Sequence, residues 1–407
     1  MSPAARFNPL PYPPPPAPRR LRLRFALRTL SLLALLTLCS LHARASVEPA
    51  ASADSTREIQ LSTETGRLRI GVVGLVHAHV EGLLWQSTQR PDLKIVGIYD
   101  PDRALFDRLA AKYNLDSALY HASLNEMLDA SKPEAVSVMT SIKDHHMVAD
   151  ACAPRGVHML FEKPLACSND DARQIASLAL KHRVLALTNF ETSWYASLRE
   201  AKRLVDSGGR ASIRKMVFRH GHKGPKEIGC SPEFLAWLTD PAQNGGGAVV
   251  DFGCYGAVLS TWLMNGQRPT SITASTTTLK PAIYPRVDDN ATIILTYPGA
   301  TATIQASWAW THDNKEADIY TERGSIHSGK WEELQVRDEN GPLKPIKPSP
   351  KPTDLENEWT YLRQVVRGQC AVDQLSSLEL NLIAVEIVEA ARRAARAPAP
   401  AGGIETP

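Results

Sequence analysis

Two stretches of the chain bring together residue types that suit acid–base chemistry. VHMLFEKPLACS places Glu162 and Lys163 directly after an apolar run, and NGGGAVVDFGCYGAVLSTWLMNG carries Asp251 and Tyr255. Oxidation of an alcohol needs a base that takes the hydroxyl proton while a hydride leaves for a cofactor. Tyrosine ionises near pH 10, so it needs a nearby ammonium, here that of Lys163, to stabilise its phenolate. On a helix Asp251 and Tyr255 share one face; alternatively, Asp251 caps the helix and Tyr255 is a packing aromatic.

A third stretch, RIGVVGLVHAHVEGLL, begins like a dinucleotide-binding turn. An apolar strand that contains Gly71 leads to Gly74, and the helical pattern that follows would present free N–H groups to a pyrophosphate. Such a turn normally has a second glycine and a small residue where this chain has Val76 and His79, with His77 between them. We predict that Gly71, Gly74, Val76 and His77 contact a dinucleotide. The two histidines donate to its phosphates, line the pocket beside the nicotinamide, or are loop residues without a role.

An acidic residue follows the next apolar run. Asp100 lies somewhat beyond the roughly 20-residue spacing at which an acid bonds the ribose 2′-hydroxyl of a dinucleotide. A carboxylate at this place repels a 2′-phosphate, so Asp100 favours NAD over NADP. The alternative is that Gly74 is a plain turn glycine and that Asp100 caps the following helix.

The elements that must position these residues alternate between strand and helix. Apolar strands of this kind, separated by helices, predict a doubly wound parallel sheet covered on both faces. Ligands of such sheets bind beyond the carboxyl ends of the strands, where Gly74, Asp100, Thr140 and Glu162 fall. The predicted strands are residues 68–73, 93–100, 134–140, 157–162 and 184–190. The first helix between them follows the first strand and ends near residue 89, and the others are about 102–113, 123–129, 145–154 and 170–182.

The EKP tripeptide and the GGG-x-x-x-D-x-G segment together resemble one family. This is the glucose–fructose oxidoreductase, inositol dehydrogenase and rhizopine catabolism (Gfo/Idh/MocA) family of NAD(P)-dependent oxidoreductases. The resemblance implies a Rossmann domain at 68–189 and an α+β domain at 190–353 whose mainly antiparallel sheet often builds oligomers. It also implies two C-terminal helices, within 354–396, that pack back on the first domain.

The resemblance assigns roles to the polar residues. Lys163 matches the family lysine that meets nicotinamide and substrate, and Asp251 matches its acidic partner. Tyr255 stands where most members have histidine and some have tyrosine. After the fourth strand the family has Thr-Pro-Asn and then a histidine.

Here only Thr140 and His145 match that last pattern. We predict that Thr140, His145, Glu162 and Lys163 contact the cofactor. The missing asparagine and the two missing loop glycines put the cofactor geometry in doubt.

The N-terminus has the pattern of an export signal. A region rich in arginine, including the pair Arg19-Arg20, precedes an apolar run at 29–41 that is too short to span a membrane. Ala43-Arg44-Ala45 fits a cleavage site, so we predict a signal peptide at 1–45, a flexible linker at 46–67 and a disordered tail at 397–407. An uncleaved anchor is the alternative. The mature chain is expected in the periplasm, with no stable membrane span.

Composition excludes other classes of protein. With 43% hydrophobic residues, 22% charged residues and a net charge of +3, the chain has no basic surface for nucleic acid. The cysteines are scattered without a CxxC pair, which argues against a disulfide framework or a zinc knuckle. The histidine pairs at 77/79, 145/146 and 220/222 cannot share one helix face, so no metal site is predicted.

Three functions remain open. The first is an NAD-dependent dehydrogenase of a sugar or polyol, working as a homo-oligomer (a dimer or tetramer). Because free NAD is scarce outside the cytoplasm, we expect this enzyme to hold its NAD tightly. The second is a glycosidase that uses NAD transiently, through oxidation, elimination, hydration and reduction. The third is a sugar-binding scaffold without catalysis, against which the retained Lys163, Asp251 and Tyr255 argue.

Overall fold

The computed structural model describes residues 66–208 and 212–396. The predicted signal peptide, nearly all of the predicted linker and the predicted tail lie outside these residues and stay predictions. Among the helices of the described part, none combines the length and the apolar character needed to cross a membrane.

Six parallel strands form the first sheet, sheet A, in the order β3-β2-β1-β4-β5-β6. This is the doubly wound arrangement that the alternation predicted. The chain crosses from one half of the sheet to the other between β1 and β4, which is where open parallel sheets bind ligands. The strands are β1 (Leu68–Val73), β2 (Leu93–Tyr99), β3 (Tyr120–His121), β4 (Ala135–Val138), β5 (His158–Glu162) and β6 (Ala186–Asn189).

Helices cover sheet A, and all residues of β4 and β5 are buried. Side chains cap several of these helices: Asp102 accepts the N–H groups of Ala104 and Leu105, and Ser168 accepts that of Asp171. The helices are α1 (Val80–Gln89), α2 (Arg103–Tyr113), α3 (Leu124–Ser131), α4 (His145–Cys152) and α5 (Asn169–His182).

Gly71 has a packing role rather than the predicted contact with a cofactor. It lies in the middle of β1, away from the carboxyl edge of the sheet. A Cβ atom at this position would lie 3.1 Å from Cγ1 of Val136 and 3.2 Å from Cε of Met127. The glycine therefore lets the neighbouring strand and α3 pack closely on β1.

Eight strands form the second sheet, sheet B, in the order β14-β13-β12-β11-β7-β10-β9-β8. Every neighbouring pair is antiparallel except β7 and β10, so the prediction of a mainly antiparallel sheet is confirmed. The strands are β7 (Ile213–Gly221), β8 (Ser271–Thr277), β9 (Asn290–Tyr297), β10 (Ala300–Ser307), β11 (Asn314–Thr321), β12 (Gly324–Ser328), β13 (Leu334–Asp338) and β14 (Lys344–Pro345).

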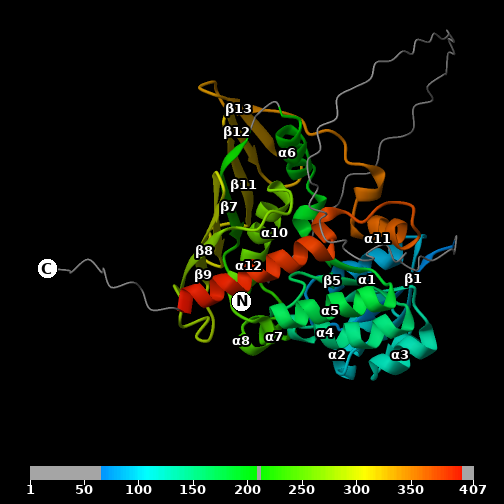
Figure 1. Ribbon diagram of the computed structural model, residues 1–407. Coiled ribbons are helices and arrows are strands. Elements are labelled where there is room, and N and C mark those ends of the chain that lie inside the picture. Colours follow the sequence, from blue (N-terminus) through cyan, green and yellow to red (C-terminus); the bar gives the residue numbers. More distant parts are fainter. Residues whose placement is uncertain (1–65, 209–211, 397–407) are drawn as a thin grey trace, which may run out of the picture. The chain divides into compact units, whose positions relative to one another are not determined.

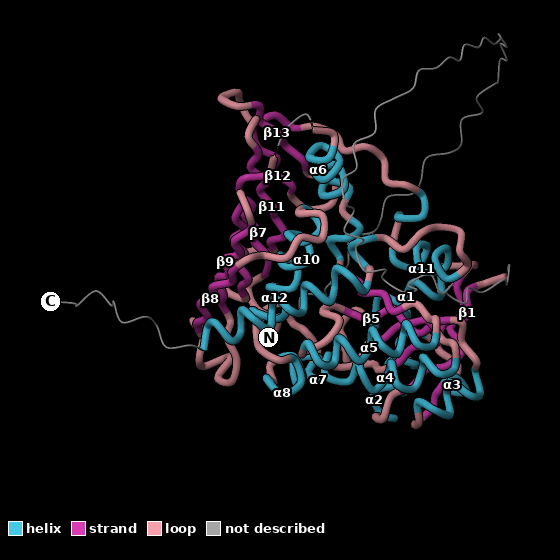
Figure 2. Tube along the Cα trace, viewed as in Figure 1, coloured by secondary structure: helices cyan, strands magenta, loops and turns pink. Residues whose placement is uncertain are grey.

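Helices gather on one side of sheet B. Figure 2 shows α6 (Ala196–Asp206), α10 (Gly253–Leu263) and α12 (Leu378–Arg396) on the same side of its strands. All residues of α10 are buried, because it lies between the sheet and α12. Along β8, exposed residues alternate with half-buried ones, as in a strand with one face in water.

The C-terminal helices connect the two sheets. α11 (Glu358–Val366) shares its core with β1 and α1, through residues that include Trp359 and Leu362. α12 contacts both α5 of the first part and α10 and β8 of the second, and Figure 1 shows it running between the two sheets. The C-terminal helices α11 and α12, which are far from sheet A in the sequence, thus hold both parts together.

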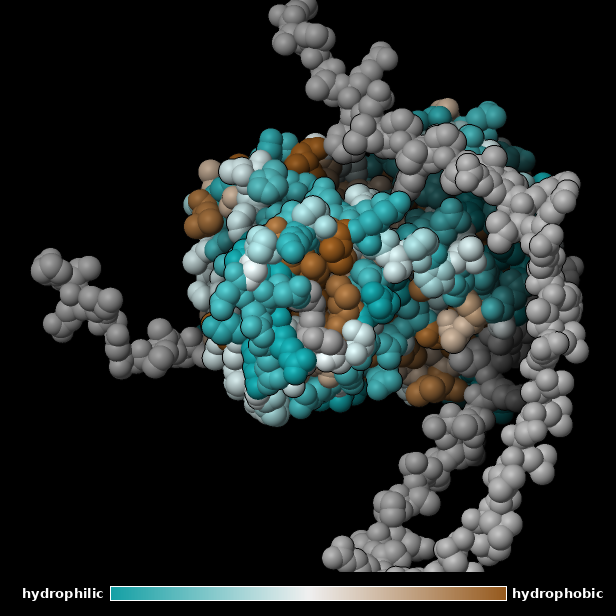
Figure 3. Space-filling view, turned by 90° about the horizontal axis from the view of Figure 1, so that it is seen from above, coloured by the Kyte–Doolittle hydropathy of each residue, from teal (hydrophilic) through white to brown (hydrophobic). Residues whose placement is uncertain are grey.

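The described surface is largely hydrophilic in the view of Figure 3, where apolar residues gather in separate groups. The exposed large apolar side chains come from distant parts of the chain and include Trp85, Leu180, Leu279 and Trp331. Single exposed apolar residues of this kind are normal for soluble domains.

The docking of α11 can be tested at Leu362, whose side chain is fully buried. We expect Leu362→Ala to lower the free energy of unfolding by about 2–5 kcal/mol, because it leaves a cavity between α11 and β1. Urea unfolding measures the change. Leu343→Ala, at an exposed leucine, is the matched control and should change the value by no more than about 0.5 kcal/mol. Equal effects of the two changes would contradict the packing described.

Candidate active site

The turn after β1 lies against the end of β4. Gly74 has a φ of +85°, and a Cβ atom there would lie 2.7 Å from Cγ2 and 2.8 Å from the backbone nitrogen of Thr140. Only glycine tolerates both the left-handed backbone and this close approach. The sequence prediction of a tight strand-to-helix turn at Gly74 is therefore confirmed.

Asp100, at the end of β2, fixes this turn. One of its carboxylate oxygens accepts the N–H of Leu75 at 2.7 Å, and the other accepts the N–H of Asp102 at 2.8 Å. The side chain is buried, and burial raises the pKa of Asp100. Asp102, not Asp100, caps α2 with its side chain.

A cavity of about 450 Å³ opens over these residues. Gly74, Val76, Asp100 and Thr140 line it from sheet A. Residues of α7 (Pro232–Leu238), of α8 (Pro241–Asn244) and of the short link between them, all from the second part of the chain, line the opposite side; they include Glu233, Trp237, Asp240 and Gln243. Trp237 donates its indole N–H to the carbonyl of Val76 at 3.3 Å and so ties α7 to the turn. The cavity is thus shared by both parts of the molecule.

Lys163 and Asp251 form a buried ion pair. Lys163 follows β5, and its Nζ donates to the Asp251 carboxylate and, at 3.1 Å, to the Asp251 carbonyl oxygen. Trp308 donates its indole N–H to the other carboxylate oxygen at 2.8 Å. Burial disfavours both charges, but the attraction between the two groups is stronger. The pKa of Lys163 is therefore raised and that of Asp251 is lowered. The structure thus brings together the lysine and the acid that the sequence predicted as partners.

The glycine run explains how Asp251 reaches this place. A Cβ atom on Gly247 would lie 1.8 Å from the carbonyl oxygen of Asp288, so a side chain is excluded. The Asp288 carboxylate accepts the N–H groups of Gly247 at 2.8 Å and Val249 at 2.7 Å. These bonds fix the start of α9 (Ala248–Asp251), a one-turn helix whose last residue is Asp251.

Asp251 and Tyr255 do not share a continuous helix, contrary to the prediction. α9 ends at Asp251, and α10 begins at Gly253. The N–H of Tyr255 bonds the carbonyl of Phe252 at 3.3 Å. The break leaves the Asp251 carbonyl oxygen free to accept a hydrogen bond from the Lys163 ammonium. In a regular helix this carbonyl would accept the N–H of Tyr255 instead.

Tyr255 lies beside the pair in an aromatic surrounding. Its ring packs edge-on against Phe190 and His220, and Nζ of Lys163 lies 5.1 Å from its centroid. Burial, followed by the Glu191 carboxylate, raises the pKa of Tyr255 well above 10. This direction is opposite to the one expected for a phenolate stabilised by Lys163, because burial and the nearby Glu191 carboxylate both disfavour the charged phenolate. Tyr255 is therefore a protonated phenol at neutral pH.

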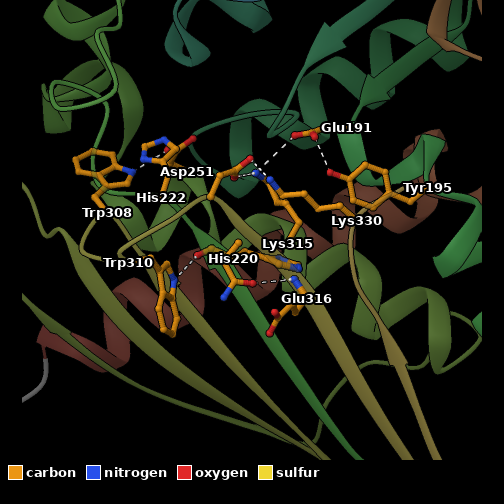
Figure 4. A network of polar contacts seen from close by, with 12 residues as sticks. Glu191, Tyr195, His220, His222, Asp251, Trp308, Trp310, Lys315, Glu316 and Lys330 are labelled. Carbon is orange, nitrogen blue, oxygen red and sulfur yellow. Dashed lines mark hydrogen bonds and ion pairs between the residues drawn. The ribbon is translucent and has the colours of Figure 1, made fainter. Parts of the chain in front are cut away.

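A network of charged residues lies next to Tyr255, and Figure 4 shows its members Glu191, Lys315 and Lys330 close together. Lys315 of β11 is buried, with Nζ 3.1 Å from Asp313 and 3.6 Å from Glu191. Lys330 also pairs with Asp313, and Tyr195 donates its hydroxyl to Glu191 at 2.6 Å. Nζ of Lys315 lies 5.7 Å from the centroid of the Tyr255 ring. This network was not predicted from the sequence. The one pattern that indicates it is a lysine, Lys315, at an inward position of a strand.

Two histidines and Glu162 meet at the carboxyl edge of sheet A. Nδ1 of His79 lies 3.1 Å from Oε2 of Glu162, and Nε2 of His77 lies 4.0 Å from the same oxygen. Burial lowers the pKa of His77 to about 3, whereas the pKa of His79 is raised, because Glu162 outweighs burial. The prediction that these histidines cannot converge assumed a helix, but both precede α1, which begins at Val80.

His145 lies away from the cavity surface. Its side chain is fully buried at the start of α4, and it is not among the residues that line the cavity. Nδ1 donates to the carbonyl of Leu165 at 3.0 Å, and burial lowers the pKa of the ring to about 4. The neutral ring holds the loop after Lys163 rather than making the predicted contact from the cavity wall.

Two family models match the chain. Residues 68–190 match the model described as "Oxidoreductase family, NAD-binding Rossmann fold", and residues 198–327 match the "GFO/IDH/MocA C-terminal domain". The chain belongs to the Gfo/Idh/MocA family. The predictions of the family and of an NAD(P)-dependent oxidoreductase are confirmed.

Relatives and solved structures agree with this membership. The chain is 24% identical over 251 residues to trans-1,2-dihydrobenzene-1,2-diol dehydrogenase of Xenopus tropicalis, which spans 60% of this chain and 70% of that protein. It is 23% identical over 350 residues to the human enzyme of the same name, spanning 80% and 96%.

Among solved structures, aldose-aldose oxidoreductase from Caulobacter crescentus, complexed with glycerol, has a TM-score of 0.68 at 19% identity, covering 81% of this chain and 98% of that one. An inositol dehydrogenase homolog from Azotobacter vinelandii, complexed with NAD+, also has a TM-score of 0.68, at 17% identity, covering 83% and 97%. Both share the fold of this chain.

The residues at the edge of sheet A fit an adenine dinucleotide. Gly74 keeps the turn free of a side chain, the cavity lies beside it, and Asp100 stands at the end of β2. Gly74, Asp100 and Thr140 would hold the adenosine and pyrophosphate parts, and Lys163 would meet the nicotinamide part. Val76 replaces the second glycine of the usual turn, so the close approach of phosphates to the backbone is reduced there.

The Lys163–Asp251 pair predicts a pH dependence of stability. The folded-state pKa of Asp251 is lowered, so its contribution is present above the ordinary aspartate pKa of about 3.9 and is lost as pH falls further. We expect Asp251→Asn to cost roughly 3–5 kcal/mol at pH 7, because Lys163 stays buried without its partner. The deficit should shrink toward pH 3.

Urea unfolding between pH 3 and 7 measures this deficit. Asp129→Asn, which removes an exposed carboxylate paired with Arg155, is the control and should show little change. A deficit for Asp251→Asn that stays constant over the whole range would contradict the assigned charges.

Proposed function

We propose that the protein oxidises a CH–OH group of a sugar, a polyol or a related carbohydrate by hydride transfer to a tightly held NAD. The observation that carries this proposal is the buried Lys163–Asp251 pair, which joins the end of β5 in sheet A to α9 in the second part of the chain. Family membership supplies the hydride chemistry, and the geometry supplies the place for the substrate.

The nicotinamide, when bound, accepts a hydride from the substrate carbon. The chain must then remove the hydroxyl proton. The Lys163 ammonium can donate a hydrogen bond to the substrate oxygen, and the Asp251 carboxylate can accept the proton through the pair. Trp308 orients that carboxylate, and Tyr255, as a neutral phenol, can hold the substrate oxygen by a hydrogen bond.

The charges near Tyr255 favour a neutral, hydroxyl-rich substrate. Lys315 and Lys330 are matched by the carboxylates of Glu191 and Asp313. These paired charges place hydrogen-bond donors next to acceptors. Because they leave no net charge, they do not favour a substrate with an ionic group. His220 and His222 add neutral rings, because burial lowers the pKa of the first to about 3 and of the second to about 4.

We further propose that the enzyme is exported to the periplasm, keeps one NAD through many turnovers, and forms a homo-oligomer. Support for export is the basic region and apolar run before residue 45. Support for retention is that residues of sheet A and of α7–α8 both line the cavity, so that two parts of the chain can contact the dinucleotide. Support for the oligomer is that the side of sheet B opposite to its helices carries no helix of this chain among the described residues, so that a second copy could pack there.

The chemistry is tested by two substitutions. We expect Lys163→Ala and Tyr255→Phe each to lower turnover by roughly 10² or more, which for Lys163 is the scale of general acid–base catalysis and for Tyr255 that of losing one fixed hydrogen-bond donor to the reacting oxygen. Formation of NADH from a panel of sugars and polyols, followed by its absorbance, measures the effect. Far-UV circular dichroism checks that both variants fold. Near-normal turnover in both would refute the proposed roles; a glycoside cleaved without net NADH would point to the redox-neutral glycosidase instead.

Cofactor choice is tested at Asp100. We expect Asp100→Ser to weaken the binding of NAD and to favour NADP relative to the parent, because the carboxylate that repels a 2′-phosphate is gone. Asp100→Asn, which also removes the charge but keeps one acceptor oxygen for the Leu75 N–H, should shift the preference in the same direction. Calorimetric titration with both dinucleotides measures the preference. Tighter binding of NADP than of NAD by the parent would show that Asp100 does not face the ribose.

A further inference from the structure

Three metal-ligating side chains meet where the usual dinucleotide turn keeps small residues. His77 and His79 come from the turn after β1, and Glu162 comes from the end of β5. One ligand atom from each lies within 4.8 Å of the other two. The role proposed above for the turn uses Gly74 and Asp100, and it leaves this cluster without a function.

The spacing is close to that of a bound ion. An ion with ligand bonds of roughly 2.1 Å holds neighbouring ligand atoms about 3.0–3.4 Å apart. Nδ1 of His79 and Oε2 of Glu162 are already 3.1 Å apart. Two separations remain: Nε2 of His77 lies 4.0 Å from the same oxygen, and the ligand atoms of the two histidines lie within 4.8 Å of each other. Both close with small shifts of the His79 and Glu162 side chains toward His77.

The orientation of Glu162 also favours an ion. Its Oε2 is buried and accepts no hydrogen bond of good geometry among the described residues, although His79 lies beside it. Its Oε1 accepts the amide N–H of Asn189 at 3.1 Å, and Asn189 in turn accepts the indole N–H of Trp194 at 3.0 Å. Such an outer chain of hydrogen bonds fixes ligating carboxylates in metal sites.

Both histidines are positioned so that they can bind an ion. His77 is packed by the rings of Phe234 and Trp237, with centroids 5.1 and 5.7 Å away, so its ring has a fixed position. The side chain of His79 is half exposed, which gives an ion a path from solvent. One weak contact is lost on binding: Nδ1 of His77, which accepts the His79 N–H at 3.3 Å, carries the proton once Nε2 holds the ion.

We propose that His77, His79 and Glu162 form a binding site for a divalent transition-metal ion, with zinc or iron(II) as the class that suits two imidazoles and one carboxylate. Such a set leaves positions open for water or for a ligand oxygen. Glu162 is followed directly by Lys163, so the ion lies next to the proposed reaction centre. Its further role, which rests on the proposed function, is to bind an oxygen of the carbohydrate.

The site is tested by metal binding to the purified full chain, without an affinity tag and after treatment with a chelator. We expect one Zn²⁺ per chain by calorimetric titration, and with Co²⁺ a visible absorption spectrum typical of nitrogen and oxygen ligands. His79→Ala and Glu162→Gln should each abolish or strongly weaken binding. Asn189→Ala, which removes the support of Glu162, should weaken it by roughly 10–100-fold.

His146→Ala is the matched control, because it removes a histidine that lies near two carboxylates elsewhere on the surface, at 3.4 Å from Asp150 and 3.9 Å from Asp171. This control should bind Zn²⁺ like the parent. No binding by the parent, or equal binding by the parent and His79→Ala, would overturn the proposal. No substrate is present in this measurement, so a failure of dehydrogenase activity would count against the proposed function alone.

Discussion

The ion pair between Lys163 and Asp251 is the interaction on which the rest of the site depends. Two buried charges are costly unless they meet with good geometry and their remaining atoms are hydrogen-bonded. Here the lysine comes from the end of a parallel strand of sheet A, and the acid comes from a short helix beside sheet B. The pair therefore forms only when both parts of the chain are folded and docked, which makes the reaction centre a property of the assembled molecule.

Local features of the sequence serve this docking. The glycine run lets α9 start against the backbone of Asp288, and the break before α10 turns the Asp251 carbonyl oxygen toward Lys163. α12 then lies against helices of both parts, and α7 reaches over the turn after β1. Each of these contacts joins segments that are far apart in the chain.

The sequence predicted those elements whose pattern is local. Alternation of apolar strands and helices predicted sheet A, and the family resemblance implied the mainly antiparallel sheet B. The EKP and GGG segments predicted that Lys163 and Asp251 act together. What depends on long-range packing was not predictable: Gly71 makes room for α3, Lys315 is paired with Glu191 and Asp313, and Tyr255 keeps its proton because it is buried. The convergence of His77, His79 and Glu162 was missed because the turn was treated as helix.

Replacement of the small residues after Gly74 changes how a dinucleotide is held. The usual turn binds phosphates by close approach to the backbone, whereas here Val76 and the histidines reduce that approach. Helices α7 and α8 line the opposite side of the cavity from the second part of the chain. The tight hold on NAD that we propose would then rest on contacts beyond the turn, including those with these helices.

The most direct test of this account is to purify the protein without added cofactor, denature it and measure the released dinucleotide by mass spectrometry, with exchange against isotope-labelled NAD followed before denaturation. The account predicts close to one NAD or NADH per chain and slow exchange. Absence of any dinucleotide together with no binding of added NAD, or complete exchange within the time of mixing, would contradict it.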